Sequence, residues 1–500
     1  MKEPLTATSV SASVPPKAYT VEREQTNMTT ASEERFSQHM QKVLKGISAP
    51  ISTGGRIALE TEPTITLKGC RSSFTMTLAK NESGDPWGDA RTEAKLDRQA
   101  EMLRGLMDKM PKASFGQGSE TKYDPSVRDA LQMKAEDFEV NVPTEKLEDI
   151  KAQIKSDLQL ETDIVLEGYS LNMYEKGGRF VKHKDTPRGE DMLGTLLICL
   201  PSLFTGGEFE TSMGAEKASY LTRYKSYSWE TTEGGCYDWW KDTPNNKELP
   251  WCAFFADVDH EIKTVLGGVR VTVAYLIRRK DSKSAHSQLP RQIMEKEQAS
   301  IVRDELQKAL GDETFLESGG KIGYPCLHLY TNKEVFPSGK DSSDPLSKEQ
   351  ISKLKGRDLI VANAAASCSL DVYIVPYLSH DLQEDIAPYK LSKFPKKKKC
   401  PRYMSEEDVG DHFDGTRDHR DDFDEKNRPY NQADVWMLEF GDEEQAKLDV
   451  GSCDNYNYEG YYGNEASYTS FYVEAALHIE VPDSFDREDM IKAAKKARTE

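Results

Sequence analysis

Four side chains in the first half of the chain have the types needed to hold a metal ion and an organic acid. His183 and Asp185 are separated by one residue, and His260 and Arg270 follow later. Two imidazoles and one carboxylate on one side of a metal leave its other positions open, as non-haem iron(II) oxygenases need. The open positions then take a bidentate 2-oxo acid and oxygen. A planar guanidinium suits the far carboxylate of 2-oxoglutarate, because the two groups form parallel hydrogen bonds.

The region that must position these groups has the pattern of short strands. Apolar and β-branched runs separated by glycine pairs predict strands near 165–175, 193–200, 207–211, 225–230, 252–258 and 269–277. Many short strands without long helices between them are typical of an antiparallel barrel or jelly roll. The predicted fold class is therefore mainly β with flanking helices, α+β overall.

Strand alternation gives these side chains a common direction. Residues i and i+2 of a strand point to the same face, so His183 and Asp185 can both face the interior of a barrel. Arg270 and Thr272 share one face of the last strand, and the valines beside them share the other. An arginine aimed into a barrel needs an anion, because an unpaired buried charge is costly. Thr272 can add a hydroxyl donor to the same anion.

The His-x-Asp pattern occurs three times in the chain. The three pairs are His183/Asp185, His412/Asp414 and His419/Asp421. The last two lie where aspartates are so dense that a match is expected by chance, and a solvated acidic loop explains them. For the first pair a polar surface loop is the alternative. For His260 the alternative is a strand-end histidine bonded to a neighbouring carboxylate.

Two segments resemble a known family. HKDTPRGEDMLGTLLICLPSLFTGGEF and DHEIKTVLGGVRVTVAYLI resemble the double-stranded β-helix of prolyl 4-hydroxylase-like 2-oxoglutarate/Fe(II) dioxygenases, over about residues 115–280. The resemblance implies His183, Asp185 and His260 as catalytic metal ligands and Arg270 as the 2-oxoglutarate anchor. It also implies that Tyr174 hydrogen-bonds the same carboxylate. The alternatives are that Tyr174 is barrel core and Thr272 an ordinary strand residue.

The same resemblance implies an activity. The cofactor would be Fe(2+), with 2-oxoglutarate and O2 as co-substrates and ascorbate as a candidate reductant. The implied reaction hydroxylates a C–H bond and decarboxylates 2-oxoglutarate to succinate and CO2. Many procollagen-type members carry lysine where this chain has Arg270, so the substrate stays open between a protein side chain, most simply proline, and a small metabolite. A non-catalytic jelly-roll binding module is the alternative function.

The composition of the chain limits the kinds of partner and the compartment that we expect. The formal net charge of −19 argues against a nucleic-acid substrate, since nucleic-acid binders present a basic face. The eight cysteines form no CxxC pair, and no run is long and apolar enough to span a membrane. With no secretory signal at the N-terminus, we expect an intracellular protein, cytoplasmic or nuclear. The run PKKKKCPR, with Lys396–Lys399, resembles a nuclear-import signal, and a solvated basic loop is the alternative. The oligomeric state stays open.

The chain divides into three predicted regions. Residues 1–28 are rich in Ser, Thr and Pro and are expected to be disordered. Residues 29–280 would form the oxygenase domain, with support helices at 29–46 and after Pro143. Residues 281–500 would form an α+β region of unknown role, with a helix near 290–310, strands at 358–362, 371–377 and 471–481, an acidic loop at 405–427 and a helix near 484–498. The pieces at 354–358 and 462–465 resemble the C-terminal region of uncharacterised relatives.

Overall fold

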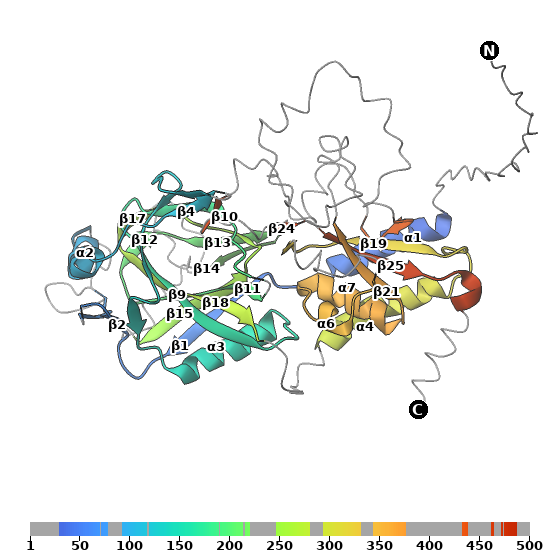
Figure 1. Ribbon diagram of the computed structural model, residues 1–500, viewed down its shortest axis with the longest axis horizontal. Coiled ribbons are helices and arrows are strands. Elements are labelled where there is room, and N and C mark those ends of the chain that lie inside the picture. Colours follow the sequence, from blue (N-terminus) through green and yellow to red (C-terminus); the bar gives the residue numbers. More distant parts are fainter. Residues whose placement is uncertain are drawn as a thin grey trace, which may run out of the picture.

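The computed structural model has two lobes that lie side by side, and it is mostly β with several helices (Figure 1). It describes residues 30–70, 72–78, 93–117, 120–189, 191–213, 216–220, 247–280, 294–331, 344–376, 433–438, 462–464, 472–473 and 475–487. The first lobe holds most of the strands. The second combines a smaller sheet with helices.

A six-stranded antiparallel sheet forms one layer of the first lobe. Its order is β1 (Ser52–Ala58), β15 (Glu248–Phe255), β11 (Met192–Cys199), β18 (Arg270–Arg279), β9 (Ile164–Tyr174) and β7 (Leu131–Lys134). The sequence predicted β9, β11, β15 and β18 to within a few residues. β11 is buried along its whole length, which accounts for its nearly unbroken apolar run.

A five-stranded sheet forms the facing layer. Its order is β14 (Glu216–Tyr220), β13 (Phe209–Met213), β16 (Asp259–Ile262), β10 (Arg179–His183) and β6 (Arg128–Asp129). A two-stranded ladder joins β12 (Phe204–Gly206) to β17 (Val265–Gly268). Apolar side chains of both sheets, among them Leu197, Phe209, Phe254 and Ile262, form one buried cluster, which we call the inner core.

Helices and short strands surround this pair of sheets. The outer face of the large sheet packs with α3 (Thr144–Asp157), whose buried residues Ile150 and Ile154 repeat at helical spacing. α2 (Glu93–Met107) lies against β17. Two small antiparallel sheets complete the lobe. One contains β3 (Ser73–Thr75), β2 (Thr64–Leu67) and β8 (Phe138–Val140), and the other contains β23 (Tyr462–Gly463), β4 (Phe115–Gln117) and β5 (Glu120–Lys122).

The second lobe is built on a four-stranded sheet. Its order is β21 (Asp371–Pro376), β25 (Ala475–Val481), β19 (Gly320–Pro325) and β22 (Val435–Trp436), with β19 and β22 parallel. α4 (Met294–Leu310) and α7 (Gly356–Ser367) pack together, and α7 contacts β21 and β25. The short α6 (Lys348–Ile351) precedes α7, and β20 (Tyr330–Thr331) pairs with β24 (Tyr472–Val473).

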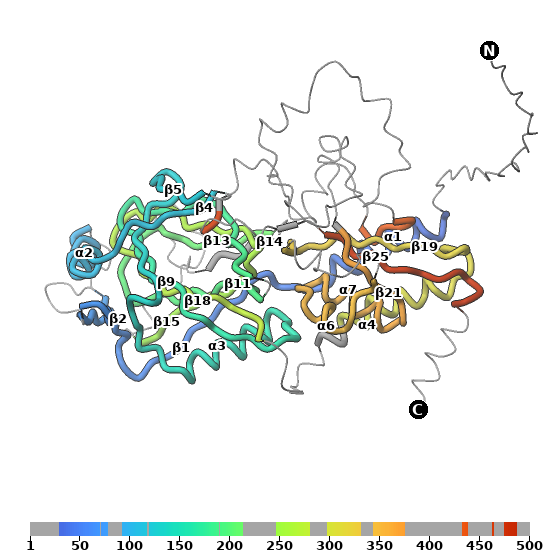
Figure 2. Tube along the Cα trace, viewed as in Figure 1, coloured from blue at the N-terminus to red at the C-terminus, as the bar shows by residue number. Residues whose placement is uncertain are grey.

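The N-terminal helix α1 (Ala31–Lys45) belongs to this second lobe (Figure 2). Thr30 and Glu33 form a capping box that starts it. Its apolar face enters the core of the second lobe, where the rings of Phe36 and Phe315 lie 4.9 Å apart between centroids. The sequence predicts this helix as a support of the oxygenase domain, within residues 29–280. The structure corrects that placement, because amphipathic spacing gives the apolar face of a helix but not the surface that covers it.

One predicted strand is a helix. Residues 358–362 lie inside α7, which is buried on nearly all sides and rich in alanine. A short apolar run fits a buried strand and a buried helix equally well, and alanine favours the helix. The sequence pattern did not predict α2 or β1. In β1, Gly55 lies against Trp251, whose ring leaves only 3.0 Å for an added Cβ atom.

Several predictions fall outside the described residues. They concern the tail at 1–28, a strand at 225–230, the basic run at 396–399, the acidic loop at 405–427 with its two His-x-Asp pairs, and most of a helix at 484–498. Within the described ranges, no helix has the length and hydropathy needed to cross a membrane.

A buried ionic cluster joins the two lobes. Asp257, three residues before His260, is fully buried. Its carboxylate accepts hydrogen bonds from Lys355 Nζ at 2.8 Å and from His328 Nδ1 at 2.9 Å. The backbone N–H of Leu329 donates to it as well, at 3.0 Å. Burial raises the pKa of Asp257, but the charges of Lys355 and His328 outweigh it and hold the pKa well below the ordinary aspartate value.

Candidate functional site

Strand register brings two distant histidines together. His183 ends β10 and His260 lies in β16, and these strands pair antiparallel with His183 directly opposite His260. Opposite residues of an antiparallel pair share a face. The two imidazole centroids are therefore only 4.2 Å apart, and both side chains are buried.

Asp185 completes the cluster, although it lies beyond the end of β10. We had expected strand alternation to align it with His183. Instead, its backbone N–H donates to the carbonyl of Ala256 at 3.0 Å, which fixes the backbone just beyond the strand. One ligand atom each of His183, Asp185 and His260 lies within 4.8 Å of the others. The side chain of Asp185 is also buried.

Backbone contacts fix which nitrogen of each histidine is available. His183 Nδ1 lies 2.8 Å from the carbonyl of Val181, and His260 Nδ1 lies 2.9 Å from that of Val258. A carbonyl only accepts hydrogen bonds, so each Nδ1 carries the proton and each Nε2 keeps its lone pair. Burial, reinforced by the neighbouring charge of His260, lowers the pKa of His183 well below its ordinary value. His183 is therefore neutral at neutral pH, as a metal ligand must be.

The carboxylate of Asp185 is held by two donors that no sequence pattern indicated. Thr195 Oγ1 donates to Asp185 Oδ2, and Asn464 Nδ2 donates to Asp185 Oδ1 at 2.6 Å. Thr195 is a polar residue in the otherwise apolar strand β11, and that was its only signal. Asn464 lies far along the chain, in a piece that we noted only for its resemblance to relatives. Metal-binding carboxylates are commonly held by such hydrogen bonds.

Arg270 is the unusual charge of the lobe. It is fully buried, and none of its three guanidinium nitrogens has a hydrogen-bond partner among the described residues. Gly207 lies close against it, where an added Cβ atom would come within 3.2 Å of Arg270 Cδ and where the backbone φ is +67°. A buried guanidinium without a partner is costly, so the position fits an anion bound from outside the chain.

The other predicted anchors surround Arg270. Tyr174 on β9 is directly opposite Arg270 on β18, and its ring centroid lies 5.7 Å from Arg270 Cζ. Thr272 lies two residues along the same strand and is buried on the same face. The structure thus brings Tyr174, Arg270 and Thr272 to one wall. Their role as 2-oxoglutarate ligands stays a prediction.

Neutral groups line the space between the sheets. Cys199 is directly opposite Thr272, and its face is shared by Cys252 on β15. Burial raises the pKa of Cys199 to about 11 and that of Cys252 to about 12, so both are neutral thiols at physiological pH. The ring of His260 lies 4.6 Å from that of Phe254, which belongs to the inner core with Tyr174 and Cys199. The histidine cluster and the wall of Arg270 therefore face the same interior.

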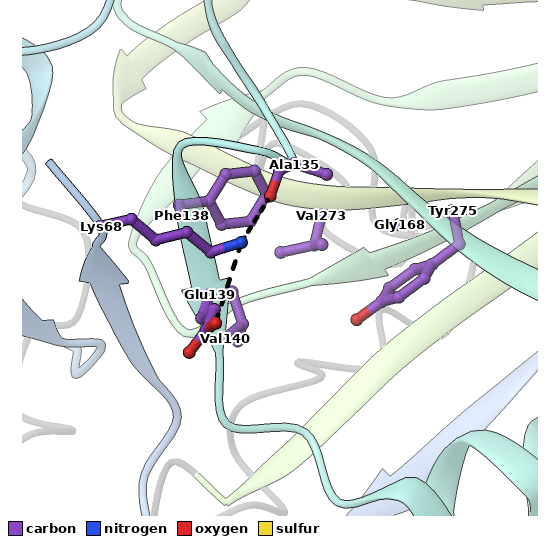
Figure 3. A pocket seen from close by; sticks show the side chains of 8 residues that line it. All are labelled: Lys68, Ala135, Phe138, Glu139, Val140, Gly168, Val273 and Tyr275. Atoms are coloured by element: carbon purple, nitrogen blue, oxygen red, sulfur yellow. Dashed lines mark hydrogen bonds and ion pairs between the residues drawn. The ribbon is translucent and has the colours of Figure 1, made fainter.

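A surface cavity of about 300 Å³ is unrelated to this site (Figure 3). It is lined by Val273 and Tyr275 of β18, which alternate with Thr272 and so point to the opposite face of the sheet. Lys68 crosses it to reach the carbonyl of Ala135 at 3.3 Å and Glu139 at 3.8 Å. It thus lies on the outer face of the sheet, whereas the candidate site lies on the inner one.

No family model matches the chain, and no curated protein does. Among solved structures, neighbours are prolyl hydroxylases and 2-oxoglutarate–Fe(II) oxygenases. A prolyl-4-hydroxylase from Pseudomonas putida has 11% identity and a TM-score of 0.23, and the match covers 48% of this chain and 99% of that one. A prolyl hydroxylase from Trichoplax adhaerens, solved with a peptide fragment of hypoxia inducible factor, has 10% identity and a TM-score of 0.23, over 52% and 99%. A viral collagen prolyl hydroxylase from Paramecium Bursaria Chlorella virus-1 has 14% identity and a TM-score of 0.21, over 38% and 92%.

Proposed function

We propose that this chain is an Fe(II)- and 2-oxoglutarate-dependent oxygenase that hydroxylates a C–H bond. The observation that carries the proposal is the buried guanidinium of Arg270, which has no hydrogen-bond partner among the described residues and faces the same interior as the buried cluster His183, Asp185 and His260. A buried charge without a compensating partner would destabilise a purely structural core. A site for a dicarboxylic acid beside a metal explains both features together.

The donor set fits iron(II). Two neutral imidazoles and one carboxylate are the ligands of the facial triad, which leaves positions open for a chelating co-substrate and oxygen. When bound, iron would activate O2, with 2-oxoglutarate as the two-electron reductant: one oxygen atom would enter the C–H bond and the other would enter succinate, with release of CO2. The protein supplies binding, orientation and a dry chamber.

Each named side chain has a physical task in this proposal. Arg270 binds the far carboxylate of 2-oxoglutarate in a bidentate manner. The hydroxyls of Tyr174 and Thr272 lie on the same wall and can donate to that carboxylate. The thiols of Cys199 and Cys252 are uncharged and small, so they leave room for the carbon chain of the acid.

We also propose that the first lobe is a double-stranded β-helix, or jelly roll. The large sheet contains β15-β11-β18-β9 and the facing sheet contains β14-β13-β16-β10 in that order. Along the chain, β9, β10, β11 and β13 alternate between the two sheets, as do β15, β16 and β18. Such alternation of antiparallel strands encloses a chamber between two layers.

The proposed substrate class is a side chain of a protein or peptide, proline being the simplest, and a small metabolite is the other outcome of the test. The test begins with anaerobic addition of Fe(II) and 2-oxoglutarate to the full chain. We expect a weak visible charge-transfer band that needs both components. On admitting oxygen, succinate should form, and an oxygenated product (+16 Da for one oxygen atom) should appear in proteomes or metabolite extracts. Binding of iron without any band or succinate would favour a non-catalytic binding module instead.

Replacing Arg270 by alanine should weaken 2-oxoglutarate binding by about 2–5 kcal/mol, as expected when one partner of a buried charge pair is removed. Titration of the charge-transfer band measures this directly. Arg278→Ala is the matched control on the same strand, because Arg278 already forms an ion pair with Asp191 at 2.9 Å and is partly exposed. Equal affinities in the wild-type chain and Arg270→Ala would rule out Arg270 as the anchor.

A further inference from the structure

The residues just after β23 link the second lobe to the metal cluster. β23 pairs with β4, with Tyr462 opposite Gln117 and Gly463 opposite Gly116, and it contacts β10, the strand that ends in His183. Figure 2 shows this short red segment beside β4, away from the other late elements. The next described strands of the chain, β24 and β25, lie in the second lobe. The chain therefore leaves the second lobe, touches the first at this point and returns.

Asn464 makes the decisive contacts at this point. It is buried, with 7% of its surface exposed. Its amide nitrogen donates to Asp185 Oδ1 at 2.6 Å, while its amide oxygen accepts the backbone N–H of Thr186 at 3.1 Å. The two hydrogen bonds tie the Asn464 side chain to the carboxylate of Asp185 and to the backbone of the next residue, and we call this pair of bonds the clamp. The amide orientation is set by this arrangement, because a backbone N–H can only donate and a carboxylate can only accept.

This clamp acts on the orientation of the Asp185 carboxylate. The final torsion of an aspartate is broad, so an unsupported carboxylate can rotate. Asp185 also lies outside the regular strand that holds His183. Thr195 holds Oδ2 and Asn464 holds Oδ1, the oxygen that lies 3.7 Å from His260 Nε2. Two donors on opposite oxygens fix the plane of the carboxylate relative to the imidazoles.

We propose that Asn464 is a positioning residue for the metal, acting by fixing the carboxylate of Asp185 from the far end of the chain. This inference rests on the proposed function, because it takes Asp185 as a metal ligand. It gives one role to the part of the chain after residue 280: it completes the support of the metal site. A chain truncated before β23 would keep all three ligands but lose this support.

The test measures metal binding by the full chain, with Co(II) as the probe. Asn464→Leu removes both hydrogen bonds at similar volume, and Asn464→Ala is a second variant in case leucine prevents folding. Loss of an outer partner typically costs about 10–100-fold in metal affinity, so we expect weakening of that size and a shift of the Co(II) visible bands. A merely structural role would lower thermal stability and leave the affinity and the bands of the folded protein unchanged.

Asn363→Leu is the matched control. Asn363 Nδ2 also donates to a carboxylate, that of Glu161 at 3.0 Å, but this contact is exposed and remote from the cluster. Its Co(II) affinity should equal that of the wild-type chain. Unchanged affinity and bands in folded Asn464→Leu and Asn464→Ala would overturn the positioning role alone. Failure of the wild-type chain itself to bind Co(II) would overturn the proposed function, and the positioning role with it.

Discussion

An Asp185→Ala variant is expected to lose succinate formation altogether, even with excess Fe(II) and 2-oxoglutarate. Asp185 is the one anionic member of the cluster, so its removal leaves the metal with two neutral imidazoles. It also removes the acceptor of Thr195 and Asn464, which are then left as donors in a buried place. Succinate released from 2-oxoglutarate under oxygen, measured by mass spectrometry, gives the result.

The chain contains its own control for this variant. Asp421 lies in the third His-x-Asp pair, His419/Asp421, which matches the pattern in an acidic stretch. Asp421→Ala should keep the wild-type rate. Asp185→Asn, which keeps the shape and removes the charge, tests whether the loss is electrostatic or comes from a cavity. Full activity in Asp185→Ala would mean that the ligands are wrongly assigned.

The alternation of side chains along the last strand of the first lobe was predicted correctly from the sequence. Alternation along β18 puts Arg270 and Thr272 on the inner face and the valines beside them on the outer one, as the structure has them. The order of the candidate groups along the chain was also informative, because each lies at or near a predicted strand. The relative directions of side chains within one strand could be predicted, because successive side chains point to opposite faces.

The part that depends on pairing between distant strands could not be predicted. The register of β10 on β16 places His183 against His260, and no local pattern specifies a register between strands so far apart. Asp185 faces the cluster because its backbone bonds to Ala256, not because a strand continues through it. Asn464 approaches from a segment nearly at the other end of the chain. Its residue type is common in loops, and the resemblance of 462–465 to relatives implied no role for it.

The same limit explains the misread strand at 358–362. Lys355 and Asp358 lie at the start of α7. In the structure, Asp358 is fully buried and accepts hydrogen bonds from the hydroxyls of Tyr324 and Tyr330. Lys355 is buried too, against Asp257 of the other lobe. A charged residue that a distant partner buries cannot be distinguished from a surface residue in the sequence alone. The contact between the lobes was therefore not predicted.

Lys355→Met is expected to destabilise the protein by about 3–5 kcal/mol, because it leaves the charge of Asp257 buried with a reduced set of partners. Both side chains are at most 7% exposed, so water cannot take the place of the ammonium group. Urea unfolding measures the loss. Lys353→Met is the matched control: Lys353 pairs with Glu349 at the surface, where such a pair contributes about 0.3–0.5 kcal/mol.

The pH dependence separates a charge effect from lost packing. Asp257 has a pKa below its unfolded value of about 3.9, so the stability it contributes is present above that pH and is lost as the pH falls toward the folded pKa. The difference in free energy of unfolding between the wild-type chain and Lys355→Met should therefore be largest near neutral pH and should decrease in acid. A difference that stays constant down to pH 3 would assign the loss to packing instead.

A double variant completes the argument. Asp257→Asn removes the charge and keeps an acceptor for His328 Nδ1 and the N–H of Leu329. If the harm in Lys355→Met comes from an uncompensated carboxylate, adding Asp257→Asn should restore part of the lost stability, so the two changes are less than additive. Fully additive losses would show instead that Lys355 and Asp257 stabilise the junction of the lobes independently.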